Sequence, residues 1–276
     1  MITIAQIKQD SIKDLQKAKI PNPLLETEVI ISSVLKKDRY KIHTEDYLQL
    51  TDQQRKKILQ KIKRRLNFEP LAYILGKKEF YSLEFMVNNQ VLVPRPETEF
   101  LVDLVLEQAP LKSKILDLGT GSGAIAIALK HYRSDLKIFA SDISSTALKV
   151  AQKNSLKLLG ERNISFYQGD LFKPLAKHRF DFIVSNPPYL SFSSREKLPL
   201  DLSFEPPEAL FAKEHGLKII KKIINQSKKY LNPQGSLLLE IDPLQQEDLK
   251  KLAEDNHFKI SFQNDYLGNP RIALLK

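Results

Sequence analysis

The sequence predicts an α/β protein in which residues 99–276 form a seven-stranded, mostly parallel sheet with helices on both faces, and residues 1–78 form a small all-helical domain. Three observations predict it. Short apolar runs alternate with segments of helical length in the C-terminal two thirds, which is typical of βαβ units. A glycine-rich turn joins one such run to an Ala-rich helix. Polar residues directly follow several runs, where ligands of parallel sheets bind.

Residues 3–67 are predicted to form three or four helices. Apolar residues recur with a helical period at the start of the chain until two prolines interrupt them. Further helices are expected at 24–35 and 51–66, with Thr51 as an N-cap. The region contains no glycine, which favours compact helices over a nucleotide loop. By itself this pattern indicates a domain that stabilises or caps the rest of the chain.

A β-hairpin is predicted between the two parts of the chain. Residues 80–93 alternate in polarity, and Asn88 and Asn89 separate two short runs, which is typical of a hairpin turn. We therefore divide the chain into a helical domain at 1–78, a hairpin linker at 79–98 and an α/β domain at 99–276.

The α/β domain is expected to alternate strands and helices. The strands are predicted at 114–118, 136–141, 163–167, 180–184, 235–241, 258–262 and 271–275. The helices are predicted at 123–131, 145–159, 213–231 and 245–256.

A glycine-rich loop follows the first of these strands, in the segment KILDLGTGSGAIAIAL that ends at Leu129. Its glycines allow a sharp turn and close approach of the backbone to a ligand, and the helix behind it presents free N–H groups. Asp142 ends the next strand, 25 residues after Asp117. A carboxylate there can accept hydrogen bonds from ribose hydroxyls.

This loop alone fits two classes of cofactor. Gly119, Gly121 and Ala124 also satisfy the dinucleotide fingerprint, with Asp142 as the ribose ligand. Asp117 favours a methyltransferase over a dehydrogenase, because an acid before the glycines would repel a pyrophosphate but could bind the amino group of a methionine moiety.

The tetrapeptide Asn186-Pro187-Pro188-Tyr189 follows the buried run FDFIV. The prolines lack N–H donors and have a fixed φ, so the loop is stiff and offers mainly carbonyl acceptors. Asn186 Oδ1 and the Pro187 carbonyl can accept both hydrogens of a planar NH2 group while the Tyr189 ring lies against its face. That arrangement turns the nitrogen lone pair toward an electrophile. A plain strand-ending turn is the alternative.

The glycine loop, the acidic second strand and NPPY together resemble class I S-adenosylmethionine methyltransferases, whose domain is Rossmann-like and seven-stranded. Two further segments, the one from Glu69 to Tyr81 and VPRPETE at 93–99, resemble the peptide chain release factor N5-glutamine methyltransferase family. The resemblance covers most of residues 69–276 and, more loosely, the N-terminal helices. DNA and RNA methyltransferases with NPPY lack PRPETE, so the combination is specific.

The resemblance implies methyl transfer from S-adenosylmethionine to the side-chain amide nitrogen of the glutamine in the Gly-Gly-Gln motif of release factors, in the cytoplasm. Asn186, Pro187 and Tyr189 would be catalytic and, with Pro188, would bind the substrate. The helical domain would dock the release factor. The cofactor would contact residues of four loops, namely Asp117, Gly119, Thr120, Gly121, Ser122, Gly123, Asp142, Ile143, Asp170, Leu171 and Asn186.

Two loop segments depart from the family pattern. The family often has glycines after the stretch FEPPEAL, where this chain has Ala212-Lys213, and usually keeps one after Leu239-Glu240, where this chain has Ile241-Asp242-Pro243.

Composition narrows the possible partners. The chain has no cysteine, and its five histidines lack ligand-like spacing, so no metal is expected. No apolar stretch approaches the roughly 18 residues of a membrane span, and the N-terminal segment is unlike a secretory signal. The net charge of +10 comes largely from lysines spread along helices. We interpret this as a solvated surface and expect no stable nucleic-acid partner.

Three alternative functions remain open. A ribosomal-protein glutamine methyltransferase would share all these motifs. A DNA adenine-N6 methyltransferase would use the same loop on a flipped base, but it would need a basic recognition domain. A cofactor-binding ribosome assembly factor without catalytic function is the third.

Overall fold

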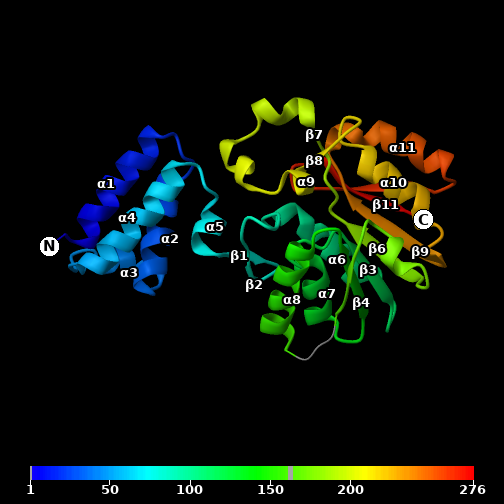
Figure 1. The fold of residues 1–276 in the computed structure, drawn as a ribbon, viewed down its shortest axis with the longest axis horizontal. Coiled ribbons are helices and arrows are strands. Elements are labelled where there is room, and N and C mark those ends of the chain that lie inside the picture. The colour runs from blue at the N-terminus through cyan, green and yellow to red at the C-terminus, as the bar shows by residue number, and fades with distance from the viewer. Residues whose placement is uncertain (1, 161–163) are drawn as a thin grey trace. The chain divides into compact units, whose positions relative to one another are not determined.

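The computed structural model describes residues 2–160 and 164–276, which divide into two compact units (Figure 1). Unit 1 comprises Met1–Gly76 and Pro199–Phe204, and unit 2 comprises Lys77–Leu198 and Glu205–Lys276. None of the helices in the described part of the chain has both the length and the apolarity required to cross a membrane.

Unit 1 is helical, as predicted. Its helices are α1 (Ile4–Lys17), α2 (Pro23–Leu35), α3 (Arg39–Thr44), α4 (Asp52–Leu66) and α5 (Leu71–Leu75). Thr51 caps α4 as predicted, because its hydroxyl accepts from Gln54 N while the Gln54 side chain accepts from Thr51 N. Isoleucines of α1, α2 and α4 form the core, and an ion pair between the buried Arg65 and the half-buried Glu26 joins α4 to α2.

Unit 2 contains one large sheet with the strand order β10-β11-β9-β6-β3-β4-β5. Only β11 is antiparallel to its neighbours. The strands are β3 (Lys114–Leu118), β4 (Lys137–Asp142), β5 (Ser165–Gln168), β6 (Phe180–Ser185), β9 (Leu231–Glu240), β10 (Ile260–Asn264) and β11 (Pro270–Leu275). The predicted fold class is therefore confirmed. Asn163, the first residue of one predicted strand, lies outside the described residues.

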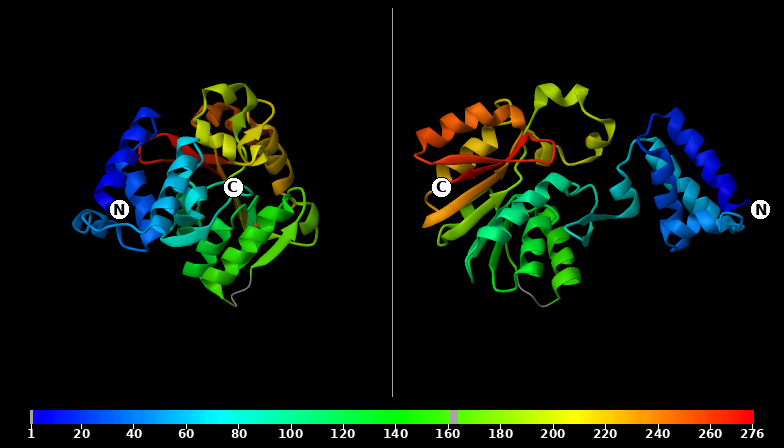
Figure 2. Two further views of the ribbon diagram at one scale, coloured as in Figure 1. Left: turned by 60° about the vertical axis from the view of Figure 1, so that its left-hand side comes forward. Right: turned by 180° about the vertical axis from the view of Figure 1, so that it is seen from behind.

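Helices cover both faces of this sheet (Figures 1 and 2). On one face, α6 (Glu99–Gln108), α7 (Ala124–Tyr132) and α8 (Ser145–Leu159) bury apolar side chains against β3, β4 and β6. On the other, α10 (Lys218–Ser227) and α11 (Gln246–Asp255) pack on β6, β9 and β11. Because both faces are covered, the central strands β3 and β6 bury apolar side chains on both faces, as parallel strands usually do.

The remaining elements of unit 2 are short. The segment before α6 is a 3-10 turn, η1 (Pro96–Thr98). Beyond β6 lie the paired two-residue strands β7 (Leu190–Ser191) and β8 (Phe211–Ala212), with η3 (Phe192–Lys197) and α9 (Pro207–Leu210) between them. The short turns η2 (Lys173–Leu175) and η5 (Pro243–Gln245) follow β5 and β9, and η4 (Leu200–Phe204) belongs to unit 1.

The predicted hairpin is present, but the predicted position of its turn is wrong. Strands β1 (Lys77–Phe80) and β2 (Leu83–Met86) are joined at Tyr81 and Ser82, not at the two asparagines. Both turn residues have positive φ, 49° and 58°, as a tight hairpin turn requires. Tyr81 N donates to Glu99 Oε1 at 2.7 Å, and Tyr132 OH donates to the Tyr81 carbonyl at 3.2 Å. Helices α6 and α7 therefore hold a turn that local sequence does not favour.

The helix predicted at 213–231 is shorter than expected. Helix α10 begins at Lys218, because Glu214, His215 and Gly216 all have positive φ. A Cβ at Gly216 would lie 1.9 Å from the Tyr189 carbonyl oxygen. This segment therefore passes directly over the backbone at the end of NPPY, which a regular helix would not allow.

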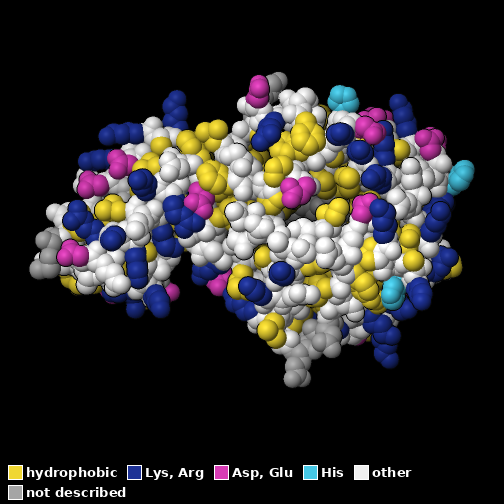
Figure 3. All heavy atoms as spheres, in the orientation of Figure 1, with side chains coloured by type: hydrophobic (Ala, Val, Ile, Leu, Met, Phe, Trp, Pro, Cys, Tyr) yellow, Lys and Arg dark blue, Asp and Glu magenta, His cyan; other side chains and the backbone are white. Residues whose placement is uncertain are grey.

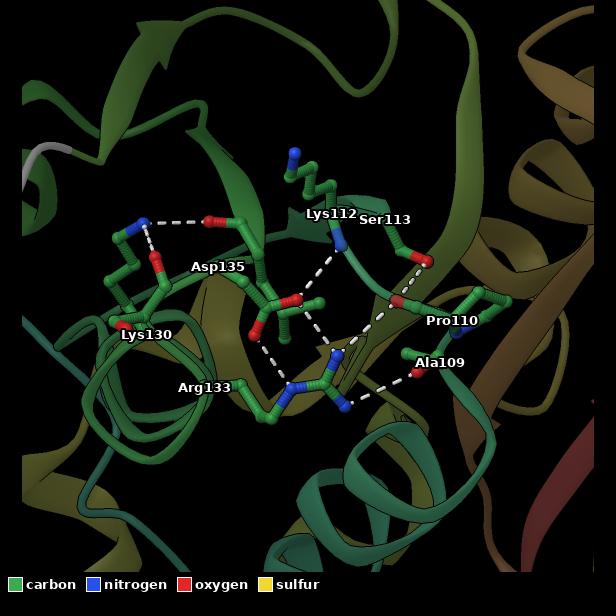
Figure 4. Close-up of polar contacts among 9 residues, drawn as sticks. Ala109, Pro110, Lys112, Ser113, Lys130, Arg133 and Asp135 are labelled. Carbon is green, nitrogen blue, oxygen red and sulfur yellow. Dashed lines mark hydrogen bonds and ion pairs between the residues drawn. The ribbon is translucent and has the colours of Figure 1, made fainter.

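The edge of the sheet where β3 and β4 begin is closed by Arg133, which follows α7 (Figure 4). Its guanidinium binds both oxygens of Asp135, at 2.7 and 2.8 Å, and donates to the Ala109 carbonyl at 3.2 Å. Asp135 also accepts from Lys112 N at 2.8 Å. The hydrogen bond from Arg133 holds the pKa of Asp135 below its usual range. These contacts tie together the segments that lead into the two central strands.

Candidate active site

A cavity of about 600 Å³ lies within unit 2 at the C-terminal ends of the parallel strands. We call it the central cavity. The loops after β3, β4, β5 and β6 all contribute to its wall, with Gly119, Gly121, Asp142, Ile143, Gly169, Asp170, Leu171, Asn186, Pro187 and Pro188. Its volume is ordinary for a cofactor site. The structure thus brings together nine of the residues predicted for the cofactor and the substrate.

The glycine loop is fixed by backbone bonds to the end of β4. The amides of Gly119 and Thr120 both donate to the Ser141 carbonyl, at 2.8 and 3.0 Å. Gly123 ends the loop with φ 83°, and a Cβ there would lie 2.8 Å from Ile127 Cδ1 and 3.2 Å from Ala151 Cβ. Glycine at this position therefore lets α7 pack closely against α8.

Four of the residues predicted to bind the cofactor lie outside the cavity wall. Thr120 and Ser122 are buried within the glycine loop, at 6% and 3% exposure, and Gly123 lies at the helix junction. Asp117 lies behind the loop, where its Oδ2 accepts from Thr120 Oγ1 at 2.7 Å and from Ala126 N at 3.2 Å. Burial raises the pKa of Asp117 to about 7. Its Oδ1 is buried and has no partner in the described part of the chain, so this atom has acceptor capacity left.

Asp142 links the glycine loop to α8 and faces the cavity. Its Oδ2 accepts from Gly121 N and its Oδ1 from Ser144 N, each at 2.9 Å. Burial raises the pKa of Asp142 above its ordinary value. Each carboxylate oxygen has a further lone pair. The carboxylate is therefore held in place by the backbone and can still accept from a vicinal diol.

Two apolar side chains complete this part of the wall. Ile143 is 62% exposed although it is large and aliphatic. Leu171 adopts φ 51°, a backbone conformation that is costly for a branched residue and persists mainly where the surroundings impose it. Beside it, Asp170 is in the wall and pairs with Lys173 at 3.1 Å. A planar heterocycle would cover the exposed surface of Ile143.

The NPPY loop begins in the wall and ends outside it. Asn186 Nδ2 donates to Thr98 Oγ1 at 3.0 Å. Tyr189, by contrast, is outside the described cavity wall, and its hydroxyl donates to Glu240 Oε1 at 3.1 Å. Burial raises the pKa of Tyr189. The predicted acceptor is thus at the cavity, whereas the predicted stacking ring packs against the core next to α10.

Sequence reasoning missed Thr98 and Glu240 as members of this site. Thr98 Oγ1 donates to Glu240 Oε2 at 2.6 Å, and burial raises the pKa of Glu240 to about 7. Glu240 ends the apolar run LLLE, so the rule that singled out Asp142 also applies to it. Wall residues from irregular segments carry no such signal, among them Gln90, Leu92, Phe192, Glu208 and Phe211.

The donor set fits S-adenosylmethionine. Asp142 suits the ribose diol, Ile143 and Leu171 suit the faces of adenine, and the unpartnered Oδ1 of Asp117 suits an ammonium group that reaches it. The positive end of α7 suits a carboxylate. No phosphate-binding lysine or arginine is needed for such a ligand.

Comparisons with known proteins agree with this chemistry. Residues 6–76 match the family model described as PrmC N-terminal domain, and residues 96–199 match that described as Methyltransferase small domain. A release factor glutamine methyltransferase from Buchnera aphidicola subsp. Baizongia pistaciae is 39% identical over 97% of this chain and 96% of its own length. One from Coxiella burnetii is 40% identical over 92% of both chains.

Among solved structures, a methyltransferase from Pyrococcus furiosus superposes with a TM-score of 0.55. It covers 77% of this chain and 96% of its own, at 18% identity, and so supports the fold alone. The protein is a methyltransferase that uses S-adenosylmethionine, and it belongs to the release factor glutamine methyltransferase family.

Proposed function

We propose that this protein methylates the side-chain amide nitrogen, N5, of the glutamine in the Gly-Gly-Gln motif of peptide chain release factors. One observation carries the proposal. The Asn186 side chain uses its NH2 group to bind Thr98, and its Oδ1 is therefore left as an acceptor beside the cavity. A primary amide needs such an acceptor, and the names of the relatives specify a release factor glutamine.

An amide nitrogen is a poor nucleophile because its lone pair is delocalised into the carbonyl. When bound, S-adenosylmethionine would supply the methyl group from its positively charged sulfur, which would become neutral by keeping the electron pair of the S–C bond that breaks. Asn186 Oδ1 and the Pro187 carbonyl accept the two amide hydrogens, which raises the electron density on nitrogen and aims it. Orientation of this kind can contribute about 7–11 kcal/mol to lowering a barrier.

The substrate nitrogen becomes acidic as the new N–C bond forms, so it can lose its proton to water without a dedicated base. Within the described cavity wall, the acids are Asp142, Asp170 and Glu208. We assign Asp142 to the ribose and Asp170 to the adenine amino group. The buried Glu240 is outside this wall and does not receive the proton.

Unit 1 is the proposed docking domain for the release factor. A cavity of about 660 Å³ in this unit is lined by Lys36, Lys57, Lys61, Lys63 and Arg64. We call these five residues the basic groove. Arg64 is already paired with Glu69, and the charge of the four lysines suits an acidic surface on the partner protein. Elsewhere Lys and Arg are interspersed with acidic side chains over the visible face of each unit (Figure 3). We place the reaction in the cytoplasm, where release factors act.

The deciding experiment measures transfer of labelled methyl from S-adenosylmethionine to a purified release factor. The control substrate has the glutamine of its Gly-Gly-Gln motif changed to alanine. We expect label on the first substrate only, and none with Asn186→Ala enzyme that still binds the cofactor within a few fold. Label on ribosomal proteins or DNA, with none on the release factor, would overturn the substrate assignment. Stable ribosome binding without any labelled product would favour an assembly factor.

A further inference from the structure

We propose that Glu240 and Thr98 are positioning residues that determine which atom of the Asn186 amide faces the substrate. The inference rests on the proposed function insofar as Asn186 is taken to bind the substrate amide. It concerns residues outside the NPPY motif, on two other elements of unit 2.

A continuous chain of hydrogen bonds joins these residues. Asn186 Nδ2 donates to Thr98 Oγ1 at 3.0 Å, and Thr98 Oγ1 donates to Glu240 Oε2 at 2.6 Å. The second oxygen of Glu240 accepts from Tyr189 OH at 3.1 Å. Glu240 is 1% exposed and Thr98 is 4% exposed, so water does not compete for these bonds. One carboxylate at the end of β9 thus holds the NPPY loop at both its first and last residues.

The direction of these bonds follows from the chemistry of the groups. An ionised carboxylate only accepts hydrogen bonds. Thr98 must therefore use its single hydroxyl hydrogen for Glu240, and it can offer only a lone pair to its other neighbour. Of the two ends of the Asn186 amide, only the NH2 group can meet a lone pair. Its Oδ1 is consequently directed away from Thr98.

The opposite orientation of Asn186 would prevent the proposed reaction. It would place an NH2 group against the NH2 group of the substrate, so that donors would face donors. The two orientations have nearly the same shape, and packing alone discriminates weakly between them. A hydrogen-bond chain that ends in a buried acceptor discriminates strongly, because the wrong orientation leaves polar groups unpaired. This explains why an acid is buried here without reaching the cavity.

The test uses two substitutions of one side chain. Thr98→Val keeps the branched shape but removes the hydroxyl, whereas Thr98→Ser keeps the hydroxyl. Methyl transfer would be measured at saturating cofactor and release factor, together with the dissociation constant for S-adenosylmethionine and the melting temperature. We expect Thr98→Val to lower kcat by about a hundredfold, the size of effect known for misplaced reacting groups, with KM and cofactor affinity within a few fold. Thr98→Ser should recover most of the lost activity.

A second readout does not depend on the substrate. In protein labelled with ¹⁵N, the Asn186 side-chain NH2 hydrogens should exchange slowly with solvent in the wild type and in Thr98→Ser. They should exchange at least tenfold faster in Thr98→Val, because their acceptor is lost. Glu240→Gln should also speed the exchange. A glutamine NH2 group can donate to Thr98, which reverses the direction of the hydrogen bonds from residue 240 to Asn186.

The two readouts separate the possible failures. If the wild type labels no release factor but the exchange pattern is as expected, the proposed function fails and the positioning chain stands. If Thr98→Val retains kcat, or exchange is equal in all variants, the positioning role is wrong. A parallel loss of melting temperature, cofactor affinity and kcat in Thr98→Val would indicate a merely structural role and would also overturn the inference.

Discussion

Asn154 on α8 binds the backbone of Met86 on β2 in both directions. Its Oδ1 accepts from Met86 N at 2.7 Å, and its Nδ2 donates to the Met86 carbonyl at 3.0 Å. The same Nδ2 donates to the Ser122 carbonyl at 2.9 Å. The side chain is fully buried. One amide therefore joins the hairpin, the glycine loop and α8.

Replacing Asn154 with alanine should lower the free energy of unfolding by about 3 kcal/mol. The change leaves backbone groups of Met86 and Ser122 buried without partners, and each such group costs about 1–3 kcal/mol. Urea denaturation monitored by circular dichroism measures the loss. The matched control is Asn225→Ala, which removes an amide from the exposed side of α10. A loss below about 0.5 kcal/mol in Asn154→Ala would contradict the assigned role.

Alanine at Gly123 and at Gly121 should have different effects. At Gly123 the new methyl would meet Ile127 and Ala151, and the backbone has φ 83°. Gly123→Ala should therefore lower the melting temperature strongly. At Gly121 there is open space beside the backbone and φ is 54°, but the residue lines the cavity. Gly121→Ala should mainly weaken binding of S-adenosylmethionine. Differential scanning fluorimetry and calorimetry distinguish the two, and equal effects on both quantities would be inconsistent with the geometry.

The pH dependence of kcat should report the ionisation of Glu240. Burial raises its pKa to about 7, and Glu97 of η1 also raises it, while bonds from Thr98 and Tyr189 and the charge of Arg271 on β11 lower it. Only the ionised carboxylate obliges Thr98 to donate. We therefore expect kcat to rise with pH between about 6 and 8 and then level off. The residual kcat of Glu240→Gln should not rise with pH. If it still rose as in the wild type, a group other than Glu240 would be responsible for the pH dependence.

Stability should change with pH in the opposite sense to activity. The folded-state pKa of Glu240, about 7, lies above the ordinary value of 4.5, so the folded protein binds more protons between these values. The contribution of Glu240 to the free energy of unfolding is therefore fully present below pH 4.5. It is lost as pH rises through 7, at up to about 1.4 kcal/mol per pH unit. Asp117 adds a second loss in the same sense. Chemical denaturation across this range should give a shallower slope in Glu240→Gln, and an unchanged slope would contradict the raised pKa.

Charge reversal in the basic groove should weaken docking without changing the chemistry. Lys57 and Lys63 are exposed on α4 and line this groove. The double variant Lys57→Glu and Lys63→Glu should raise KM for the release factor at least tenfold at low salt, with less effect at high salt. KM for S-adenosylmethionine should not change. The same charge reversal at the exposed Lys13 and Lys17 of α1 serves as the control. An equal rise in KM there would mean that the net charge of the protein, and not the basic groove, determines binding of the release factor.

The sheet was predictable because each strand can be recognised from its own short segment of sequence. The central parallel strands β3 and β6 are short, largely apolar runs buried on both faces, and polar residues at the ends of several strands reach the same edge. The hairpin turn was not predictable in this way. Tyr81 and Ser82 are poor turn residues, and bonds from α6 and α7, formed only after folding, select their backbone conformation. The Asn88 side chain instead accepts a hydrogen bond from the backbone amide of Gln90, so the two asparagines form a local turn and not the turn of a hairpin.

The site was predictable in outline for the same reason, since Asp142, Asp170 and Asn186 each follow a strand. The contact between Thr98 and Glu240 was not, although Glu240 itself also ends an apolar run. Thr98 and Glu240 are 142 residues apart, and neither carries a local signal for the other. The sequence likewise suggested that the Tyr189 ring would cover the substrate, whereas the hydroxyl binds Glu240 instead. Whether that ring approaches the substrate on binding stays a prediction.

The contact between Gly216 and the Tyr189 carbonyl limits how this lineage can diverge. Any L-amino acid at position 216 would place its first side-chain carbon where that oxygen lies. The loop after β8 therefore cannot acquire a side chain here by a single mutation while the NPPY backbone keeps its path. A homologue that carries another residue at this position must have rebuilt both loops together. One glycine codon thus links the evolutionary histories of two separate loops.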